Sequence, residues 1–492
     1  MRFGDNRFFC FVAMSMENSL QIAGVRVTHL THDSRKVQPG SAFFVLKGGR
    51  AHGADFTDEA VARGAGVIVT EHATENCPVP QYIVPDVREY MSLAAKEFFG
   101  NVADKMTLIA VVGTNGKTTC TYMLRHILTK WGVPPHAPPG IIGTLGSFIG
   151  DDCIATGLTT PDPIELHETL AEMYRRGVRT VIMEASAHAI HYRKLTGLTF
   201  RAAIFTNLSR DHLDFFETYE QYANTKIGFF GANVQTAVIN ADDPASLKIK
   251  HPNIVSYALD KPADFTATNL KLRAGGSEFK TGRARIALNL PGRFNVQNAL
   301  ACIAVAQNLG VQRKAICRAL KTLPKISGRF NTFLLKLPRR KVTCVIDYAH
   351  TPDGLEKILT SVREFARKRI IAVFGCGGNR DTTKREIMGT IAARLADFAV
   401  ITSDNPRFES PRAIMLQIEA GMKIYTQNYT LCENRAKAIY YALDMAQDGD
   451  MVVIAGKGGE TYMEIEGTRH DYSDENVIRK YETTHTKRKK GG

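Results

Sequence analysis

Two patterns of apolar residues alternate along the chain. Short apolar, β-branched runs, such as those at 107–112, 180–184 and 202–205, are typical of strands buried in a parallel sheet. Amphipathic segments lie between such runs. In one of them Leu124, Ile127, Leu128 and Trp131 have the i, i+3, i+4, i+7 spacing of a single helix face. Alternating strands and helices predict an α/β protein with doubly wound parallel sheets.

A chain of 492 residues is too long for one compact core, so we expect several domains. The pattern of strands and helices falls into three α/β regions. We predict a small N-terminal domain at 1–106, a central domain at 107–329 and a C-terminal domain at 330–492. Residues 1–20 are interpreted as a disordered extension or as the result of an upstream start codon, and 484–492 as a basic disordered tail. The strongest motifs follow strand ends, where open parallel sheets bind ligands.

Charge and cysteine content narrow the function. A net charge of +14 attracts phosphorylated substrates, nucleic acid or anionic membranes. No nucleic-acid recognition signature and no apolar run near ~20 residues occurs, so we predict neither nucleic-acid binding nor membrane insertion. Nine cysteines without a C-x-x-C pair indicate reduced thiols and a cytoplasmic location. Four of these cysteines are predicted to be buried free thiols: Cys120, Cys302, Cys317 and Cys344.

Residues 111–121, VVGTNGKTTCT, combine a strand end, glycines, a lysine and hydroxyls. In a phosphate-binding loop, glycines let backbone N–H groups approach the phosphates. The lysine reaches the terminal phosphates and a hydroxyl binds Mg²⁺. Gly113, Gly116, Lys117 and Thr118 supply these parts. The motif is shorter than the full G-x-x-x-x-G-K-[ST] because residue 111 is valine, so a purely structural turn is the alternative.

Polar residues also follow neighbouring strands. Glu184 ends one apolar run, and His212 and Asp214 follow another, whereas Lys226 lies on the next helical segment. Carboxylate, hydroxyl and imidazole groups gathered at one sheet edge would suit a magnesium nucleotide. The alternatives are structural roles for the acid and the histidine, and a surface position for the lysine.

Together the motifs GTNGKTT, TTPD, MEAS, NLSRDHLD, LPGRFNVQNALA, DYAHTPD and DNPR occur in an order that resembles the Mur ligase family. The resemblance covers about residues 25–475. It implies ATP-dependent amide formation in peptidoglycan precursor synthesis and a three-domain α/β architecture. That architecture has a small N-terminal domain, a central P-loop parallel-sheet ATPase domain and a C-terminal Rossmann-like domain. The motifs are most similar to those of ligases that add meso-diaminopimelate to UDP-N-acetylmuramoyl-L-alanyl-D-glutamate. A monomer is expected.

The resemblance also implies roles for individual residues of this sequence. ATP would be bound by Gly113, Thr114, Asn115, Gly116, Lys117, Thr118, Thr119, Asn298, Arg329 and Asp347. Mg²⁺ would be bound by Thr118, Glu184, His212 and a carbamylated Lys226. The UDP-muramoyl-dipeptide would meet Ser34, Thr159, Thr160, Ser186 and Lys194. Diaminopimelate would meet Arg380, Asp404, Asn405, Pro406, Arg407, Gly456 and Glu460. The catalytic residues would be Lys117, His212 and Lys226.

Arg407 in the segment DNPR favours a diacid substrate, because a guanidinium pairs well with a carboxylate. Relatives that add lysine lack this arginine. The sequence also departs from the family pattern. Ala187 replaces a serine, Tyr192 and Lys194 stand where glutamine and arginine are usual, Gly459 replaces a histidine, and the loop at 49–51 differs.

Three alternatives stay open at this stage. The same ligation could use L-lysine or another amine. A related ligase of the folylpolyglutamate type shares the phosphate loop and the hinge segment. Outside the enzymes, the positive charge is compatible with a nucleotide-binding scaffold or a basic nucleic-acid-binding protein.

Overall fold

The computed structural model describes residues 18–48, 52–132, 138–155, 157–338 and 340–487. Contacts between Cα atoms divide these residues into two compact units. The first comprises the described residues up to 107 together with 160–179 and 188–199, and the second comprises the remainder. The boundaries that the sequence suggested at 106 and 329 stay predictions. Most of the predicted N-terminal extension and the loop at 49–51 lie outside the described residues.

The first unit contains a parallel four-stranded sheet in the order β3-β4-β5-β6 and an antiparallel hairpin, β1-β2. The helices α2 and α4 pack against each other. The strands are β1 (Leu20–Ile22), β2 (Val25–Val27), β3 (His29–Thr31), β4 (Ser41–Phe44), β5 (Ala65–Thr70) and β6 (Gln81–Ile83). The helical segments are η1 (Ser34–Lys36), η2 (Gly53–Phe56), α1 (Thr57–Ala62), α2 (Val87–Phe98), η3 (Val102–Lys105) and α4 (Pro163–Arg175). The short helix α5 (Ala187–His191) begins at the boundary of the units.

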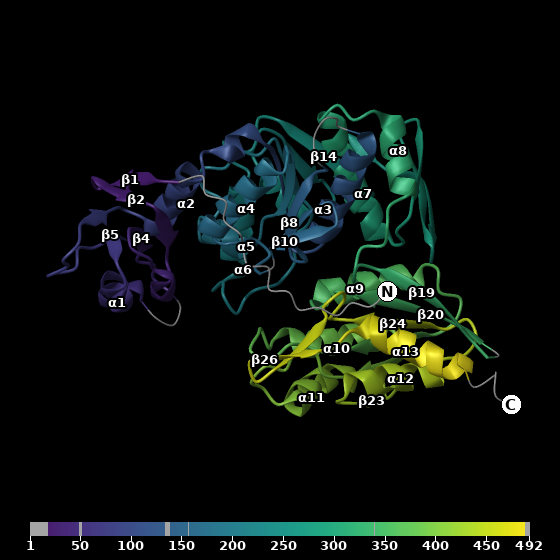
Figure 1. Cartoon of the computed structure of the whole chain (residues 1–492). Coiled ribbons are helices and arrows are strands. Elements are labelled where there is room, and N and C mark those ends of the chain that lie inside the picture. Colours follow the sequence, from purple (N-terminus) through teal and green to yellow (C-terminus); the bar gives the residue numbers. More distant parts are fainter. Residues whose placement is uncertain (1–17, 49–51, 133–137, 156, 339, 488–492) are drawn as a thin grey trace. The chain divides into compact units, whose positions relative to one another are not determined.

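The second unit contains a nine-stranded sheet in the order β10-β9-β8-β11-β7-β12-β13-β14-β15. Three of its strands, β8, β10 and β14, are labelled in Figure 1. The pairs β8-β9 and β9-β10 are antiparallel, and the other pairs with a described register are parallel. Its strands are β7 (Thr107–Val112), β8 (Gly140–Gly143), β9 (Gly146–Ile149), β10 (Asp152–Ala155), β11 (Thr180–Glu184), β12 (Ala202–Phe205), β13 (Ala237–Asn240), β14 (Ile254–Ala258) and β15 (Phe265–Thr266). Its helical segments are α3 (Lys117–Trp131), α6 (Tyr219–Gly228), η4 (Pro244–Lys248), α7 (Arg293–Asn308) and α8 (Arg313–Lys321).

An antiparallel three-stranded sheet consists of β16 (Thr268–Arg273), β17 (Gly276–Thr281) and β18 (Ala284–Leu288). It shares one hydrophobic core with strands of the nine-stranded sheet and with α3, α7 and α8. Leu124, Ile127 and Leu128 of α3 are buried there, as their spacing predicts, and Trp131 is partly buried. The core forms because α3, α7 and α8 turn their apolar faces toward the strands.

A six-stranded sheet in the order β19-β20-β24-β21-β22-β23 follows. Its strands are β19 (Asn331–Leu337), β20 (Arg340–Asp347), β21 (Ile370–Phe374), β22 (Phe398–Ile401), β23 (Tyr429–Leu431) and β24 (Met451–Ala455). One hydrophobic cluster joins the sheet to α9 (Pro352–Arg363), α10 (Lys384–Leu395) and α11 (Pro411–Met422). A second cluster joins it to α12 (Arg435–Met445) and α13 (Asp474–Lys487). The sheet is therefore doubly wound, as the sequence predicts. A hairpin of β25 (Tyr462–Ile465) and β26 (Thr468–Asp471) lies between β24 and α13 along the chain.

Two predictions need correction. α13 extends to Lys487, so residues 484–487 are helical and the predicted disordered tail does not begin at 484. Buried Ile478 and Tyr481 anchor this helix to the core, which basic composition alone does not reveal. Cys317 is only partly buried, whereas Cys120, Cys302 and Cys344 are buried. All cysteines in the described part of the chain are free thiols. No helix within the described ranges is long and apolar enough to span a membrane.

Candidate active site

The phosphate-loop motif lies between β7 and α3, at the point where the chain order of the sheet reverses. β11 flanks β7 on one side and β12 on the other, so a crevice at the carboxyl end of β7 is favoured. Gly113 has φ +150°, and a Cβ there would lie 1.9 Å from Thr206 Oγ1. Gly116 has φ +87°, and its Cβ would lie 2.6 Å from Asn298 Oδ1. Both positions therefore require glycine.

Lys117 is the first residue of α3, and its ammonium folds back over the loop. Its Nζ donates to the carbonyl oxygens of Gly113 and Thr114, each at 2.9 Å. Burial lowers the pKa of Lys117, although the charges of Glu184 and Asp211 oppose this shift. The N-cap residue Gly116 makes no side-chain cap. The first N–H groups of α3 are thus available to an anion, as phosphate binding requires.

Lys226 is almost fully buried, with 2% of its surface exposed. The alternative of a surface lysine is therefore wrong. Its Nζ donates to Thr114 Oγ1 at 3.1 Å and also contacts the hydroxyl of Tyr222. Burial and the nearby charge of Lys117 lower its pKa well below the ordinary value. This environment disfavours the charged form of an amine that lies directly against the phosphate loop.

Glu184 ends β11 and is 1% exposed. Its carboxylate accepts hydrogen bonds from the backbone N–H of Thr144 at 3.1 Å and from its hydroxyl at 2.9 Å. That hydroxyl lies 3.2 Å from Thr159 Oγ1, a predicted substrate contact. At Gly143 a Cβ would lie 2.3 Å from Glu184 Oε1, so the absence of a side chain there leaves room for the carboxylate.

His212 has a left-handed backbone, with φ +55°. Its Nε2 lies 3.4 Å from Asp211 Oδ2. Burial lowers the pKa of His212 to about 4; Asp211 opposes this shift, and Lys117 and Lys226 add to it. Burial alone would raise the pKa of Asp211, but surrounding groups, His212 first among them, lower it to about 2. At neutral pH this part of the site presents a neutral imidazole and a carboxylate.

The chemical types of the groups around the loop suit a magnesium nucleotide. Hydroxyl, carboxylate and neutral imidazole donors are all present on Thr118, Glu184 and His212, and oxygen ligands with completion by phosphate and water are usual for Mg²⁺. Among the described residues no three His, Cys, Asp or Glu side chains form a ready metal cluster. The donor set thus fits a cation brought in with phosphates, because the protein alone does not complete the site.

The linker before β19 also reaches the loop. Arg329 Nη2 donates to Thr118 Oγ1 at 3.0 Å, and its guanidinium lies 4.4 Å from the ring centre of Tyr348. Asp347 ends β20 and accepts from the backbone N–H of Phe330 at 2.8 Å. Burial raises the pKa of Asp347, while Arg329 opposes the shift.

Residues of the segment DNPR follow β22 and meet residues that follow β24. Asn405 Nδ2 donates to Glu460 Oε2 at 3.0 Å, and Lys457 Nζ donates to the same oxygen at 3.0 Å. Burial opposes ionisation of Asp404, but Lys457 and then Arg435 outweigh burial and lower its pKa. A Cβ at Gly456 would lie 2.5 Å from Asp404 Oδ2. Four of the predicted amino-acid contacts are thereby brought together.

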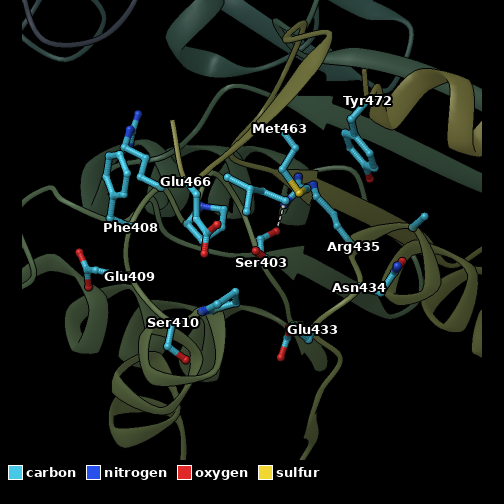
Figure 2. Close-up of a pocket in the computed structure, with 15 residues that line it drawn as sticks. Ser403, Phe408, Glu409, Ser410, Glu433, Asn434, Arg435, Met463, Glu466 and Tyr472 are labelled. Carbon is cyan, nitrogen blue, oxygen red and sulfur yellow. Dashed lines mark hydrogen bonds between the residues drawn. The ribbon is translucent and has the colours of Figure 1, made fainter. Parts of the chain in front are cut away.

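Arg407 has a left-handed backbone, with φ +54°. Its Nε donates to Glu464 Oε2 at 3.1 Å and its Nη1 to the carbonyl of Gly378 at 2.8 Å. Arg380, by contrast, is 54% exposed and lies 3.5 Å from Asp214 Oδ2. A cavity of about 630 Å³ adjoins Arg407 and is lined also by Phe408, Met463 and Arg435. Figure 2 shows the hydrogen bond from Arg435 to the backbone of Ser403 at this cavity.

The backbone of residues 327 and 328, in the linker before β19, lies very close to the turn after β24. A Cβ at Gly328 would lie 1.8 Å from the backbone nitrogen of Gly459. A Cβ at Gly459 would lie 2.5 Å from Ser327 Oγ and 3.1 Å from the carbonyl carbon of Ser327. The glycine at 459 therefore fits a turn that the linker covers closely.

The predicted dipeptide contacts of the first unit are Ser34, Thr160 and Lys194. Ser34 donates to Glu59 Oε2 at 2.7 Å. Lys194 is buried and forms an ion pair with Asp162 of the segment TTPD at 2.8 Å. Ser186, which belongs to the second unit, follows Glu184 after β11. These positions do not test the predicted substrate roles.

Comparison with known families accounts for these motifs. The model described as Mur ligase family, catalytic domain, matches residues 26–99. The Mur ligase middle domain matches 111–306, and the Mur ligase, glutamate ligase domain, matches 328–458. The chain belongs to the Mur ligase family.

Several individual Mur ligases are similar over nearly the whole chain. UDP-N-acetylmuramoyl-L-alanyl-D-glutamate--2,6-diaminopimelate ligase 1 of Clostridium acetobutylicum is 40% identical, covering 92% of this chain and 94% of the relative. The UDP-N-acetylmuramoyl-L-alanyl-D-glutamate--2,6-diaminopimelate ligase of Geobacillus thermodenitrificans is also 40% identical, covering 92% of this chain and 94% of that relative. A solved structure of a UDP-N-acetylmuramoyl-L-alanyl-D-glutamate--2,6-diaminopimelate ligase has a TM-score of 0.65 and 32% identity, covering 94% of this chain and 96% of that one. The three-domain Mur ligase architecture predicted from the motifs is confirmed.

Several groups at this Mur ligase site were not found by sequence reasoning. They are Thr144, Asp211, Tyr222, Lys457 and Glu464. Asp211 is adjacent to His212 and could have been noticed in the segment NLSRDHLD. The contacts of Thr144 and Glu464 join residues 40 and 57 positions apart, for which a single sequence carries no signal.

Proposed function

We propose that this chain is an ATP-dependent ligase that joins meso-diaminopimelate to UDP-N-acetylmuramoyl-L-alanyl-D-glutamate through an amide bond. The observation that carries the proposal is the buried Lys226 amine against Thr114 of the phosphate loop, with Lys117 and Glu184 at the same sheet edge. The names of the similar ligases supply the substrate class.

The chemistry follows from the weakness of a carboxylate as an electrophile. The free carboxylate of the dipeptide attacks the γ-phosphorus of ATP, which gives an acyl phosphate and ADP. The amine of diaminopimelate then attacks the acyl carbon. The tetrahedral adduct loses phosphate and a proton, and the amide remains. Bringing the acid, the nucleotide and the amine into line would account for most of the acceleration.

We infer that the N–H groups of residues 113–119 and the ammonium of Lys117 bind the ATP phosphates. Phosphate oxygens would replace the carbonyl groups to which Lys117 now donates. Asn298, Arg329 and Asp347 would contact the rest of the nucleotide. Removing the Lys117 charge would leave developing negative charge at the transferring phosphoryl group without a neutralising cation.

Thr118, Glu184 and His212 would hold Mg²⁺, which offsets charge on the phosphates when it is bound. The lowered pKa of His212 supports this role, because only a neutral imidazole can bind a metal. Lys226 would act as a carbamate. Its lowered pKa favours the neutral amine, which could add CO₂ with loss of a proton and so become an anion.

The C-terminal residues would bind the amino acid. Arg407 would pair with the distal carboxylate of diaminopimelate, and Glu460 would meet an ammonium group. Arg380, Asp404, Asn405, Pro406 and Gly456 would complete this site. Ser34, Thr159, Thr160, Ser186 and Lys194 would contact the nucleotide-sugar dipeptide.

The test is a phosphate-release assay with ATP, Mg²⁺ and the nucleotide-sugar dipeptide across a panel of amino acids that includes L-lysine and glutamate. We expect turnover with meso-diaminopimelate, loss of turnover without the dipeptide, and the amide product by mass spectrometry. Turnover that prefers L-lysine or glutamate would overturn the substrate assignment.

Lys117→Ala is expected to lower kcat at least about 100-fold, since a group that stabilises the transferring phosphoryl charge is lost. Lys271→Ala, at an exposed lysine of β16, is the matched control and should retain wild-type turnover. Full activity of Lys117→Ala would contradict the proposed use of the loop.

A further inference from the structure

Glu464 on β25 lies beside the DNPR segment. The β25 strand pairs with β26, and residue Ile465 forms a parallel bridge with Arg407. Met463 and Ile465 line the 630 Å³ cavity, whereas Glu464, between them, does not. Successive side chains of a strand point to opposite faces, so Glu464 faces away from the cavity.

The backbone of β25 and of Glu466, the residue after it, fixes this segment at three points. The N–H of Glu464 donates to Asn405 Oδ1 at 2.9 Å. The N–H of Arg407 donates to the carbonyl of Glu464 at 3.1 Å, and the N–H of Glu466 donates to the carbonyl of Arg407 at 2.8 Å. Arg407 is held in a left-handed conformation, φ +54°, by Glu464 of β25 and by Glu466, which directly follows that strand.

The Glu464 side chain adds a contact to the guanidinium itself. Oε2 accepts from Arg407 Nε at 3.1 Å, and the carbonyl of Gly378 accepts from Nη1 at 2.8 Å. A Cβ at Gly377 would lie 3.0 Å from Nη1, so this glycine leaves space for the guanidinium. Within the described ranges, no protein acceptor is recorded for Nη2 of Arg407. Two anchors therefore fix the plane of the guanidinium and leave Nη2 for another acceptor.

A fixed plane matters for carboxylate recognition. A guanidinium binds a carboxylate best through two parallel N–H groups, and a freely rotating arginine would lose rotamer entropy when it does so. We propose that Glu464 is a positioning residue for the amino-acid substrate. It holds Arg407 with its terminal N–H groups toward a substrate carboxylate. This inference rests on the proposed function and extends it to a residue outside the DNPR and GKGGE motifs.

The chain provides a matched control. Glu466 lies two residues further on, carries the same charge and is exposed, although unlike Glu464 it lines the cavity. Its backbone contacts Arg407, but no recorded hydrogen bond in the described structure involves its carboxylate. Substitution of Glu466 therefore removes the same charge near Arg407 without removing an anchor of the guanidinium.

The experiment measures KM and kcat for meso-diaminopimelate at saturating ATP and dipeptide. Glu464→Ala should raise the KM about tenfold and change kcat less than about twofold, the loss expected for one hydrogen bond to a charged group. Glu464→Gln keeps an acceptor and should stay within about threefold of wild type. Glu466→Ala and Glu466→Gln should match wild type, as should the KM for ATP in every variant.

Coupling to Arg407 separates positioning from a general structural role. In an Arg407→Ala background, adding Glu464→Ala should change the KM less than about twofold, because no guanidinium is left to orient. Equal effects of Glu464→Ala with and without Arg407, or an unchanged KM in the single variant, would overturn the inference. Thermal unfolding checks that each variant folds. If Glu464→Ala does not fold, Glu464→Asp moves the acceptor back by one methylene and must raise the KM.

The experiment distinguishes failure of the proposed function from failure of the positioning role of Glu464. If wild-type enzyme turns over no diaminopimelate, the proposed function fails and the positioning role fails with it. If wild-type enzyme is active and the Glu464 variants match it, only the positioning role fails.

Discussion

His167 on α4 is a buried titratable side chain outside the candidate site. It is 1% exposed, and neither ring nitrogen has a hydrogen-bond partner in the described structure. Burial lowers its pKa from 6.5 to about 4. Lys96 adds to this shift and Asp104 opposes it. The folded chain thus holds a neutral imidazole that the unfolded chain protonates more readily.

This histidine predicts an acid-dependent loss of stability. Above pH 6.5 both states are neutral at His167 and it adds no pH dependence. As the pH falls from 6.5 to 4, the unfolded state binds the proton first, and the free energy of unfolding decreases by about 2 kcal/mol by pH 5. Denaturant unfolding should show that the free energy of unfolding falls by about 2 kcal/mol more in wild type than in His167→Leu between pH 7.5 and pH 5. Equal pH slopes would contradict the assignment.

Single residues were predictable from the sequence where the proposed function depends on residues that are close together in the chain. Gly113, Gly116 and Lys117 are neighbours in the chain, and their loop could be recognised directly. The environment of Lys226 could not be derived from spacing. Its burial depends on Tyr222, one helical turn earlier, and on Thr114, 112 residues away. The His212 backbone, φ +55°, likewise has no sequence signature for a non-glycine residue.

Whole elements were predictable where an apolar run fills a strand buried on both faces. The runs at β7, β11, β12, β20 and β24 are of this kind. The β8–β10 hairpins, the β16–β18 sheet and the β25–β26 hairpin were missed. Their strands are short or partly exposed, with few long apolar runs, so the sequence looks like loop. Glu464 was missed for the same reason, because its strand was not recognised.

The end of β8 provides a test of how one strand places Glu184, a proposed Mg²⁺ ligand. Gly143 has no left-handed φ, so alanine strains the backbone little there, but its Cβ would lie 2.3 Å from Glu184 Oε1. Gly143→Ala should fold and displace the carboxylate by about 1 Å. We expect kcat to fall about 100-fold, the order of loss that such a misplacement causes. Steady-state kinetics and thermal unfolding measure the two effects.

Gly275→Ala is the matched control for that substitution. Gly275 also lacks a left-handed φ, and its Cβ would meet nothing within 4 Å. It should leave both kcat and the unfolding temperature unchanged. Wild-type kcat in Gly143→Ala would mean that Glu184 does not need its present position.

At the scale of the whole molecule, the division into two units predicts how ligands affect unfolding. The phosphate loop belongs to the second unit, which contains both the nine-stranded and the six-stranded sheet. A non-hydrolysable ATP analogue with Mg²⁺ should stabilise that unit, by about 2.7 kcal/mol at a concentration 100 times the Kd. Scanning calorimetry should show the corresponding transition at higher temperature, and the transition of the first unit unchanged.

Lys117→Ala should abolish this shift and Lys271→Ala should retain it. If the analogue raised both transitions equally, the two units would unfold together and the contact division would have no thermodynamic counterpart. The composition of each unit from segments distant in sequence, such as 160–179 with the N-terminal sheet, could not be anticipated from motif order.

The crowded turn at Gly459 limits which sequence changes can follow one another during evolution. A Cβ at Gly459 would meet Ser327 Oγ at 2.5 Å and its backbone at 3.1 Å. A residue with a side chain at 459 would therefore require the linker at 327 and 328 to shift or to change as well. The glycine and the linker are therefore an epistatic pair, in which the history of one position decides what the other can accept.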